Sequence, residues 1–320
     1  MLVKERTIPL TLSMLEALKR NLPKHHVKQR IIEDELAKSR AGYCGEQSID
    51  YYLSFLPDDH LILHNVRLSS GDYFFQIDTL LICPNIIVIL EVKNIAGMLF
   101  FDETFHQLIR TIEEKEEAFP DPILQVQRQQ RQLEAWFTHH KCPAIPIVPF
   151  VVISNPNAII KNKRTDKLVH QTVIHASAIP LKFDDLHATY THQLLSLKEM
   201  KKISQLLIKH HQPHRPDLLR QLQISENELL TGAKCEKCDH QPMQRKTGTW
   251  YCPRCQHESS DAHISALADY ALLYGPTITN KQFRNYFHIQ SSGVAKRLLG
   301  AMNLPQSGDR RNRMYHLPFK

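Results

Sequence analysis

Three side chains suited to metal-assisted chemistry lie in two neighbouring segments that have strand character. Asp78 lies in the first segment, and Glu91 and Lys93 end the second, with twelve residues between Asp78 and Glu91. Because side chains alternate along a strand, Glu91 and Lys93 point to the same face. If the strands pair through the turn at Pro84, Asp78 approaches that face from the neighbouring strand. Two carboxylates and an ammonium group would then meet at one edge of a buried sheet.

A bound divalent cation would offset the negative charges of this cluster and allow it to act on a phosphate. Burying unpaired ions is costly, and two adjacent carboxylates repel each other. Mg²⁺ prefers hard oxygen ligands and commonly takes one or two carboxylates, with water and substrate phosphate completing its shell. The metal would polarise a phosphate and activate a water that Lys93 could orient. The alternative is a solvated strand face, which is the usual origin of an isolated Glu-x-Lys pair.

The surrounding segments predict a mixed α/β core of about 150 residues. Residues 86–90 form a continuous apolar run, which is typical of a strand buried on both faces. The expected order is a helix, three strands, a hairpin, a helix and a strand. These elements are expected at residues 32–56, 61–68, 73–83, 86–93, 97–102 with 105–112, 122–140 and 148–154.

Four short motifs follow one another in this core. They are Gly-x-x-Gly-Glu at residues 42–46, Gln-Ile-Asp-x-Leu-Leu-Ile at 76–82, Glu-Val-Lys-Asn at 91–94 and Pro-x-x-Gln at 122–125. In type and order they resemble the motifs of the nuclease-related domain, NERD, a branch of the PD-(D/E)xK nuclease superfamily. The resemblance covers about residues 36–155. Ile77 stands where the wider superfamily often has proline, a departure that is common in this branch.

The resemblance implies a restriction-endonuclease-like fold, in which a mixed central sheet is flanked by helices. It implies that Asp78 and Glu91 bind Mg²⁺ or Mn²⁺ and that Lys93 serves the attacking water. Glu46 would contribute a further acid from the first helix, and Gln125 would support the site. A surface salt bridge is an alternative role for Glu46. A fold of this kind can also lose its activity, which leaves a non-catalytic DNA-binding or regulatory protein as the alternative function.

Four of the seven cysteines form two Cys-x-x-Cys pairs separated by thirteen residues, namely Cys235, Cys238, Cys252 and Cys255. This spacing permits four thiolates to close a tetrahedral Zn²⁺ site of structural type and resembles a zinc ribbon. His240 and His257 adjoin the pairs and could replace a ligand, although four cysteines suffice. A redox pair is the alternative, but no thioredoxin-like strand and helix surround either pair.

The remaining cysteines, Cys44, Cys83 and Cys142, stand alone in apolar surroundings and are expected to be buried thiols. An odd number of cysteines without an export signal argues against a disulfide framework. No stretch reaches the roughly 18 to 20 apolar residues that a membrane helix needs, and the N-terminus does not read as a signal peptide. We therefore expect a cytoplasmic protein that does not contact a membrane.

The excess positive charge is confined to the C-terminal quarter of the chain. Residues 232–320 contain 13 Lys or Arg and 6 Asp or Glu, whereas the preceding 231 residues contain 27 of each. The formal net charge of +7 therefore arises entirely after residue 231. Such a segment attracts a polyanion, and we expect DNA as the partner.

This basic segment predicts three helices followed by a hairpin. The helices are expected at residues 264–273, at 280–287 with Thr279 as the cap, and after a cap at Ser291 or Ser292. The order resembles a winged helix-turn-helix, whose third helix enters a groove of DNA. The alternative is a protein interaction module, since winged helices also serve that role.

The resemblance implies contacts with DNA from the third helix and from the wing. The residues concerned are Lys296, Arg297, Arg310, Arg311 and Arg313. Along the whole chain we expect an N-terminal helix and linker at residues 1–30, a nuclease-like domain at 31–180, a helical linker at 181–231, the zinc ribbon at 232–258 and the DNA-binding module at 261–320. Together they predict a metal-dependent nuclease that hydrolyses the phosphodiester bonds of DNA.

Overall fold

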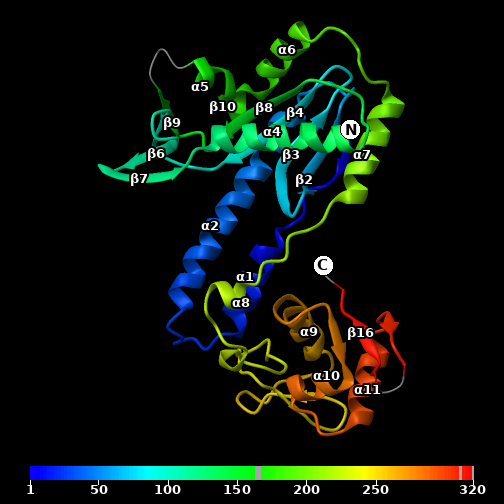
Figure 1. Cartoon of the computed structure of the whole chain (residues 1–320). Helices are drawn as coiled ribbons and strands as arrows, with labels where there is room; N and C mark the ends of the chain where they lie inside the picture. The colour runs from blue at the N-terminus through cyan, green and yellow to red at the C-terminus, as the bar shows by residue number, and fades with distance from the viewer. Residues whose placement is uncertain (163–166, 310–311, 319–320) are drawn as a thin grey trace. The chain divides into compact units, whose positions relative to one another are not determined.

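The computed structural model describes residues 1–162, 167–309 and 312–318. Contacts group the chain into two compact units (Figure 1). The first unit comprises Met1–Ile8 and Arg40–His214, and the second comprises Pro9–Ser39 and Arg215–Lys320. Each unit therefore combines an N-terminal segment with a distant part of the chain, and the boundary between them passes through one helix, Gln29–Ser48.

A six-stranded mixed sheet forms the centre of the first unit. Its strands are β1 (Leu2–Lys4), β2 (Leu61–Ser70), β3 (Tyr73–Ile82), β4 (Ile87–Lys93), β8 (Ile147–Ile153) and β10 (Val173–His175). The order is β1-β2-β3-β4-β8-β10, with antiparallel pairing from β2 to β4 and parallel pairing elsewhere. Six of the seven residues of β4 are buried, as its apolar run predicts for a central strand.

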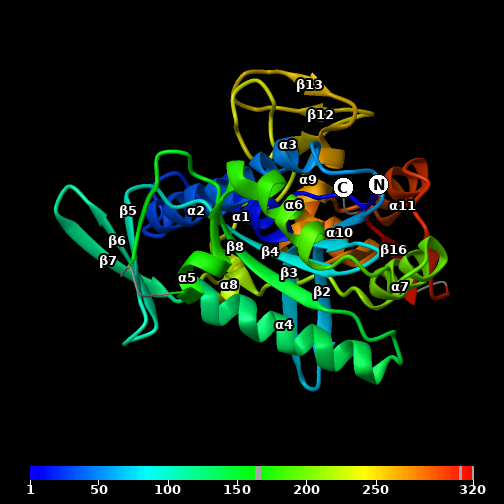
Figure 2. The ribbon, with the colours of Figure 1, turned by 90° about the horizontal axis from the view of Figure 1, so that it is seen from above.

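Helices cover both faces of this sheet (Figure 2). The helices that contribute to this unit are α2 (Gln29–Ser48), α3 (Asp50–Leu53), α4 (Pro122–His139), α5 (Lys167–Thr172), α6 (Ile179–Thr189), α7 (Leu197–His210) and the short η1 (Ala176–Ala178). Val126 of α4 and Ile203 of α7 pack in one core cluster, whereas Leu53 of α3 and Phe183 of α6 pack in another. A mixed sheet flanked by helices confirms the predicted fold class.

A smaller, four-stranded sheet accompanies the central one in the first unit. Its order is β7-β6-β5-β9, and its strands are β5 (Met98–Asp102), β6 (Gln107–Ile112), β7 (Lys115–Pro120) and β9 (Ile159–Lys161). The antiparallel pair of β5 and β6 confirms the hairpin expected there. The sequence did not predict β7, because its mostly exposed side chains lack an apolar face.

The second unit contains helices and two small antiparallel sheets. The helices are α1 (Leu10–Asn21), α8 (Leu218–Gln221), α9 (Ala262–Leu273), α10 (Asn280–Phe287), α11 (Ser292–Ala301) and η2 (Glu226–Glu228). The strands are β11 (Gln244–Arg245), β12 (Trp250–Tyr251), β13 (Glu258–Ser259), β14 (Thr277–Thr279), β15 (Gln306–Ser307) and β16 (Met314–His316). The two sheets have the orders β11-β12-β13 and β14-β16-β15.

The two small sheets and their helices share one hydrophobic core. Trp250 of β12 is fully buried in the same cluster as Leu267 of α9 and Phe283 of α10. The indole Nε1 of Trp250 donates a hydrogen bond to Nδ1 of the buried His263 over 3.1 Å. The cysteine-rich segment and the helices after it therefore stabilise each other.

Two predicted helix caps are present in this unit. Thr279 accepts a hydrogen bond from the amide of Gln282 and forms a capping box with it, and Ser291 caps α11 by accepting from the amide of Val294. The choice left open between Ser291 and Ser292 is therefore decided for Ser291. Among the residues described, every helix is too short or too polar to cross a lipid bilayer.

One expectation about the isolated cysteines was wrong. Cys83 is buried and Cys142 is partly buried, but Cys44 is exposed on α2. The next residue, Gly45, is buried. Because successive helical residues point about 100° apart, α2 turns Gly45 inward and Cys44 toward solvent.

Candidate functional site

The pairing of β3 with β4 brings Asp78 opposite Glu91. The antiparallel register ends with Thr79 opposite Leu90, and its continuation by one position places Asp78 opposite Glu91. Oδ2 of Asp78 accepts a hydrogen bond from the backbone amide of Val92 over 3.0 Å. The side chain of Asp78 therefore reaches β4 between Glu91 and Lys93.

The pairing of β2 with β3 is interrupted at the same place. The register skips one pair, Asn65 with Asp78. Asn65 has a φ of 51°, in the left-handed region that asparagine adopts more readily than most residues. Ile77 and Leu80 lie in the same core cluster although three positions separate them, which regular alternation does not allow. The interruption leaves Asp78 outside the β2 ladder and available to β4.

Both carboxylate oxygens of Glu91 accept hydrogen bonds. Oε1 accepts from Nζ of Lys93 and from Nε2 of Gln125, each over 2.7 Å. Oε2 accepts from Nε2 of Gln129 over 2.7 Å. Lys93 also donates to Oε1 of Gln125 over 3.0 Å. The side chain of Glu91 is only 4% exposed, so these donors replace water that burial has removed.

The two glutamines come from the first turns of α4. Asp121 caps the N-terminus of this helix through its side chain, and Pro122 occupies the first turn, where proline is well tolerated. Gln125 and Gln129 are four residues apart and therefore lie on the same side of the helix. Gln129 also donates to the carbonyl oxygen of Gln76 over 2.9 Å, which ties α4 to β3.

Glu46 approaches the acidic residues from α2, which packs closely at Gly45. A Cβ atom at Gly45 would lie 2.4 Å from Cβ of Asn94 and 2.8 Å from Oγ of Ser154, so the close contact requires glycine. Asn94 donates to the carbonyl oxygen of Ala41 over 2.8 Å and so joins α2 to the segment after β4. The Gly-Glu pair of the motif therefore has a physical reason. The lack of a side chain at Gly45 lets α2 pack against Asn94 and Ser154, and the next residue, Glu46, then lies near enough to influence Asp78.

The three carboxyl groups influence one another electrostatically. Burial, followed by the negative charges of Glu91 and Glu46, raises the pKa of Asp78 well above its usual range. Burial also raises the pKa of Glu46, although the charge and hydrogen bond of Arg6 oppose that rise. A site with this electrostatic character favours either a bound proton or a cation.

The donor atoms of this site suit a hard divalent cation. Among the described residues, only the four cysteines bring three or more His, Cys, Asp or Glu ligand atoms within 4.8 Å of one another, so the three carboxylates are not gathered that tightly. Mg²⁺ commonly needs only one or two protein carboxylates, because water and phosphate complete its shell. Asp78 and Glu91 therefore fit Mg²⁺ or Mn²⁺, with Glu46 as a further acid nearby.

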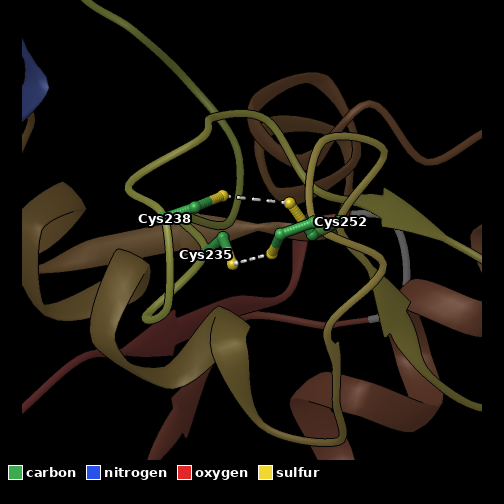
Figure 3. Close-up of side chains that lie close together, drawn as sticks. Cys235, Cys238 and Cys252 are labelled. Carbon is green, nitrogen blue, oxygen red and sulfur yellow. Dashed lines mark hydrogen bonds between the residues drawn. The ribbon is translucent and has the colours of Figure 1, made fainter.

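The four-cysteine cluster fits a zinc ribbon (Figure 3). Sγ of Cys235 lies 3.6 Å from Sγ of Cys255, and Sγ of Cys238 lies 3.5 Å from Sγ of Cys252. All four sulfur atoms lie within 4.8 Å of one another. A tetrahedral site with Zn–S bonds of about 2.3 Å separates its sulfur atoms by about 3.8 Å, so the cluster has nearly the size that Zn²⁺ requires.

Both cysteine pairs have the same local backbone structure. In each, the amide of the first cysteine donates to a histidine carbonyl oxygen five residues later, at His240 over 2.9 Å and at His257 over 2.8 Å. In each, the residue after the second cysteine, Asp239 or Gln256, has a φ of 60°. The ring of His257 contacts Glu236 over 2.9 Å. The histidines therefore shape the two turns through their backbone.

A basic hollow of about 510 Å³ lies among α10, α11 and β16 in the second unit. It is lined by Asn280, Lys281, Arg284, Ser292, Lys296, Arg313 and Tyr315. Four of these residues are basic and none is acidic. In the described part of the chain, no ion pair engages Lys281, Lys296 or Arg313, so their charges are available to an anion.

The five residues proposed to contact DNA are not all at this hollow. Lys296 and Arg313 line it, whereas Arg297 does not. Instead, the charge of Arg297 acts on Arg245 of the cysteine-rich segment and, after burial, lowers the pKa of Arg245. Arg310 and Arg311 lie outside the described residues. Lys281 and Arg284, which line the hollow from α10, were not predicted. Residues three positions apart lie on the same side of a helix, so the sequence already indicated a basic face there.

Sequence reasoning also missed residues at the acidic site. Gln129 was predictable in principle, because it lies one helical turn beyond Gln125. Arg6, which forms an ion pair with Glu46 over 2.8 Å, and Asn65 carried no comparable signal. Both lie in segments that only the tertiary structure brings to Glu46.

Comparison with known proteins identifies one matching family model. Residues 41–154 match the family model of the nuclease-related domain, NERD. No match was found among curated proteins or among solved structures. The matched segment runs from α2 to the end of β8 and includes Asp78, Glu91 and Lys93. The match to the nuclease-related domain over residues 41–154 agrees with the resemblance that the four sequence motifs predicted.

Proposed function

We propose that this protein is a divalent-metal-dependent deoxyribonuclease that hydrolyses phosphodiester bonds of DNA. The observation that carries the proposal is the hydrogen bond by which Asp78 of β3 reaches the amide of Val92 on β4, between Glu91 and the ammonium group of Lys93. These residues lie within the segment that matches the nuclease-related domain. Two acids and a lysine in this arrangement suit the hydrolysis of a phosphodiester, which needs charge stabilisation and a positioned water.

Each residue of the site has a role in this proposal. When bound by Asp78 and Glu91, Mg²⁺ or Mn²⁺ would polarise the phosphate and lower the pKa of a water molecule. Lys93 would orient the attacking water and stabilise the developing negative charge. Gln125 and Gln129 hold Glu91 in place through their amide groups. Glu46 would contribute a third acid to the cluster.

The C-terminal segments would deliver the nuclease-related domain to DNA. The three helices α9, α10 and α11 are followed by the antiparallel strands β15 and β16, which supports the resemblance to a winged helix. The strand β14, between α9 and α10, was not predicted. The hollow with Lys296 and Arg313 offers cationic groups to the phosphate backbone. Arg297, Arg310 and Arg311 stay in the proposal as further DNA contacts, as the sequence suggested. The functional segments of the proposal are residues 31–180, 232–258 and 261–320.

We also propose that Cys235, Cys238, Cys252 and Cys255 bind one structural Zn²⁺. Four thiolates leave no open coordination position, so this ion would stabilise the fold without catalysing a reaction. The cytoplasm is the compartment that fits this chemistry, because a reducing environment keeps thiols available to the metal.

A non-catalytic DNA-binding or regulatory protein is the second candidate. One observation favours it: Lys93, Gln125 and Gln129 already satisfy both oxygens of Glu91. In that case the nuclease-related domain would serve as a scaffold, and the basic hollow would provide the only activity of the protein, the binding of DNA.

Plasmid cleavage distinguishes the two candidates. Purified protein is incubated with supercoiled plasmid and Mg²⁺ or Mn²⁺, together with the variants Lys93→Ala and Lys115→Ala. Lys115 is exposed on β7 and serves as the control. The proposal predicts cleavage by wild type and by Lys115→Ala, with at least about 100-fold less cleavage by Lys93→Ala. Cleavage that survives in Lys93→Ala contradicts the role of Lys93, and binding without cleavage by wild type supports the second candidate.

A further inference from the structure

The first eight residues belong to the nuclease-like unit although they lie outside the matched residues 41–154. β1 pairs in parallel with β2. Nζ of Lys4 donates to the carbonyl oxygens of His64, over 2.7 Å, and Asn65, over 3.4 Å. Lys4 therefore binds β2 at the point where its pairing with β3 is interrupted.

Arg6 is buried among polar side chains of this unit. Its side chain is 4% exposed, and its NH1 group donates to Oε2 of Glu46 over 2.8 Å. Its NH2 group donates to Asp50 over 3.1 Å and to Thr79 over 3.2 Å, and it lies 2.9 Å from Nδ1 of His64. A planar guanidinium group with partners on several sides is held in one orientation.

The ring of His64 can accept a hydrogen bond from Arg6. Burial, followed by the positive charge of Arg6, lowers the pKa of His64 to about 4. The ring is therefore neutral at neutral pH. With the proton on Nε2, which lies 3.7 Å from a carboxylate oxygen of Asp50, Nδ1 is an acceptor. His64 thus orients Arg6 without adding a repelling charge.

Two donors converge on one oxygen atom of Glu46. Besides Arg6, the amide nitrogen of Asn65, when turned toward its acceptors, donates to Oε2 of Glu46 over 3.0 Å and to the carbonyl oxygen of Asp78 over 3.2 Å. Within the described residues, no hydrogen bond engages Oε1 of Glu46. Glu46 is therefore fixed through Oε2, while Oε1 is left for a ligand of the acidic site.

We infer that Arg6 is a positioning residue, which holds Glu46 so that its free oxygen serves the divalent cation or a water bound to it. The N-terminal segment then completes the acidic site from outside the matched domain. This inference rests on the proposed function, because it assigns a support to the same cation site. Partners of this kind commonly change metal affinity or activity by about 10-fold to 100-fold.

The test uses the full-length, zinc-loaded protein and measures the binding of Mn²⁺ by calorimetry, in addition to cleavage. The variants are Arg6→Met, Arg6→Lys and a control, Arg110→Met, which removes an ion pair with Glu117 in the smaller sheet. We expect Arg6→Met to weaken Mn²⁺ binding by about 10-fold or more. Arg6→Lys should recover part of the loss because it keeps the charge, and Arg110→Met should bind Mn²⁺ as wild type does.

A double-mutant cycle with Glu46→Gln separates positioning from a general loss of structure. If Arg6 acts through Glu46, Arg6→Met should weaken Mn²⁺ binding by less than about twofold when Glu46 is already replaced. If Arg6→Met does not fold, Arg6→Lys completes the same cycle, because lysine lacks the forked geometry of arginine.

Three outcomes overturn the inference. Wild-type affinity in Arg6→Met is one, and an equal loss with and without Glu46 is another. Absence of Mn²⁺ binding by the wild-type protein is the third, and it also removes the proposed function. The first two outcomes leave the proposed function intact, so the two failures are distinguishable.

Discussion

Gln129 of α4 donates a hydrogen bond to Oε2 of Glu91 over 2.7 Å, and both residues are almost completely buried. The contact joins a helix to a strand 38 positions away in the sequence. It defines one side of the acidic site, because Oε1, the other oxygen of Glu91, accepts hydrogen bonds from Lys93 and Gln125.

Replacing Gln129 by leucine should impair the site. The variant leaves Oε2 of Glu91 without its donor, and a buried acceptor without a partner costs about 1–3 kcal/mol. We expect cleavage or Mn²⁺ affinity to fall by about 10-fold to 100-fold. Gln127→Leu, on the same helix, is the control and should retain wild-type values. Equal behaviour of the two variants in titration and cleavage assays would refute the role of Gln129.

Asp78→Asn should remove activity and yet stabilise the metal-free protein at neutral pH. Because the pKa of Asp78 is raised in the folded state, its contribution to stability is present at low pH and is lost as the pH rises through that pKa. Asparagine can keep the hydrogen bond from Val92 without the buried charge. Thermal unfolding followed from pH 7 down to about pH 4 should show a gain over wild type that shrinks as Asp78 becomes protonated. A variant that is less stable than wild type at pH 7 would contradict this.

Removal of zinc should unfold more than the cysteine-rich segment. Trp250, Cys235 and Cys252 pack in one hydrophobic core with the helices α9, α10 and α11. Loss of the metal therefore removes side chains that cover these helices. A structural zinc site supplies about 10–16 kcal/mol in peptides at neutral pH. We expect one Zn²⁺ per chain, and chelation or Cys252→Ser should increase hydrogen exchange throughout residues 262–301. Cys44→Ser is the control. Protection of α10 and α11 that survives chelation would show that these helices fold independently.

Lys296→Ala and Arg313→Ala should each reduce the salt dependence of DNA binding. Each phosphate contact contributes about 0.9 to the slope of log K against log salt concentration, so each variant should lower that slope by about 1. Lys182→Ala, on α6 of the first unit, is the control and should leave the slope unchanged. Point variants are preferable to deletion of residues 261–320, because deletion would also open the core shared with Trp250. An unchanged slope in both variants would exclude the basic hollow as the DNA-binding surface.

Much of the fold could be predicted because the signals are local. The apolar run at residues 86–90 predicted a buried strand, and the structure has β4 there. Thr279, and Ser291 or Ser292, predicted the starts of two helices from side chains that bond to their own turn, and the structure has Thr279 and Ser291 as the caps. By contrast, β1 and β10 have three residues each, too few for a periodic pattern to be recognised.

By itself, the sequence determined that Glu91 and Lys93 share one side of a strand and that four cysteines occur at ligand spacing. These properties follow from the two-residue repeat of a strand and from the short loop within each cysteine pair. Only the tertiary structure decided that Arg6 meets Glu46, 40 positions away, and that Asn65 breaks the pairing of β2 beside Asp78. The physical reason is that such contacts depend on which strands pair and which helices cover them, and hydrophobic burial over the whole unit selects that arrangement.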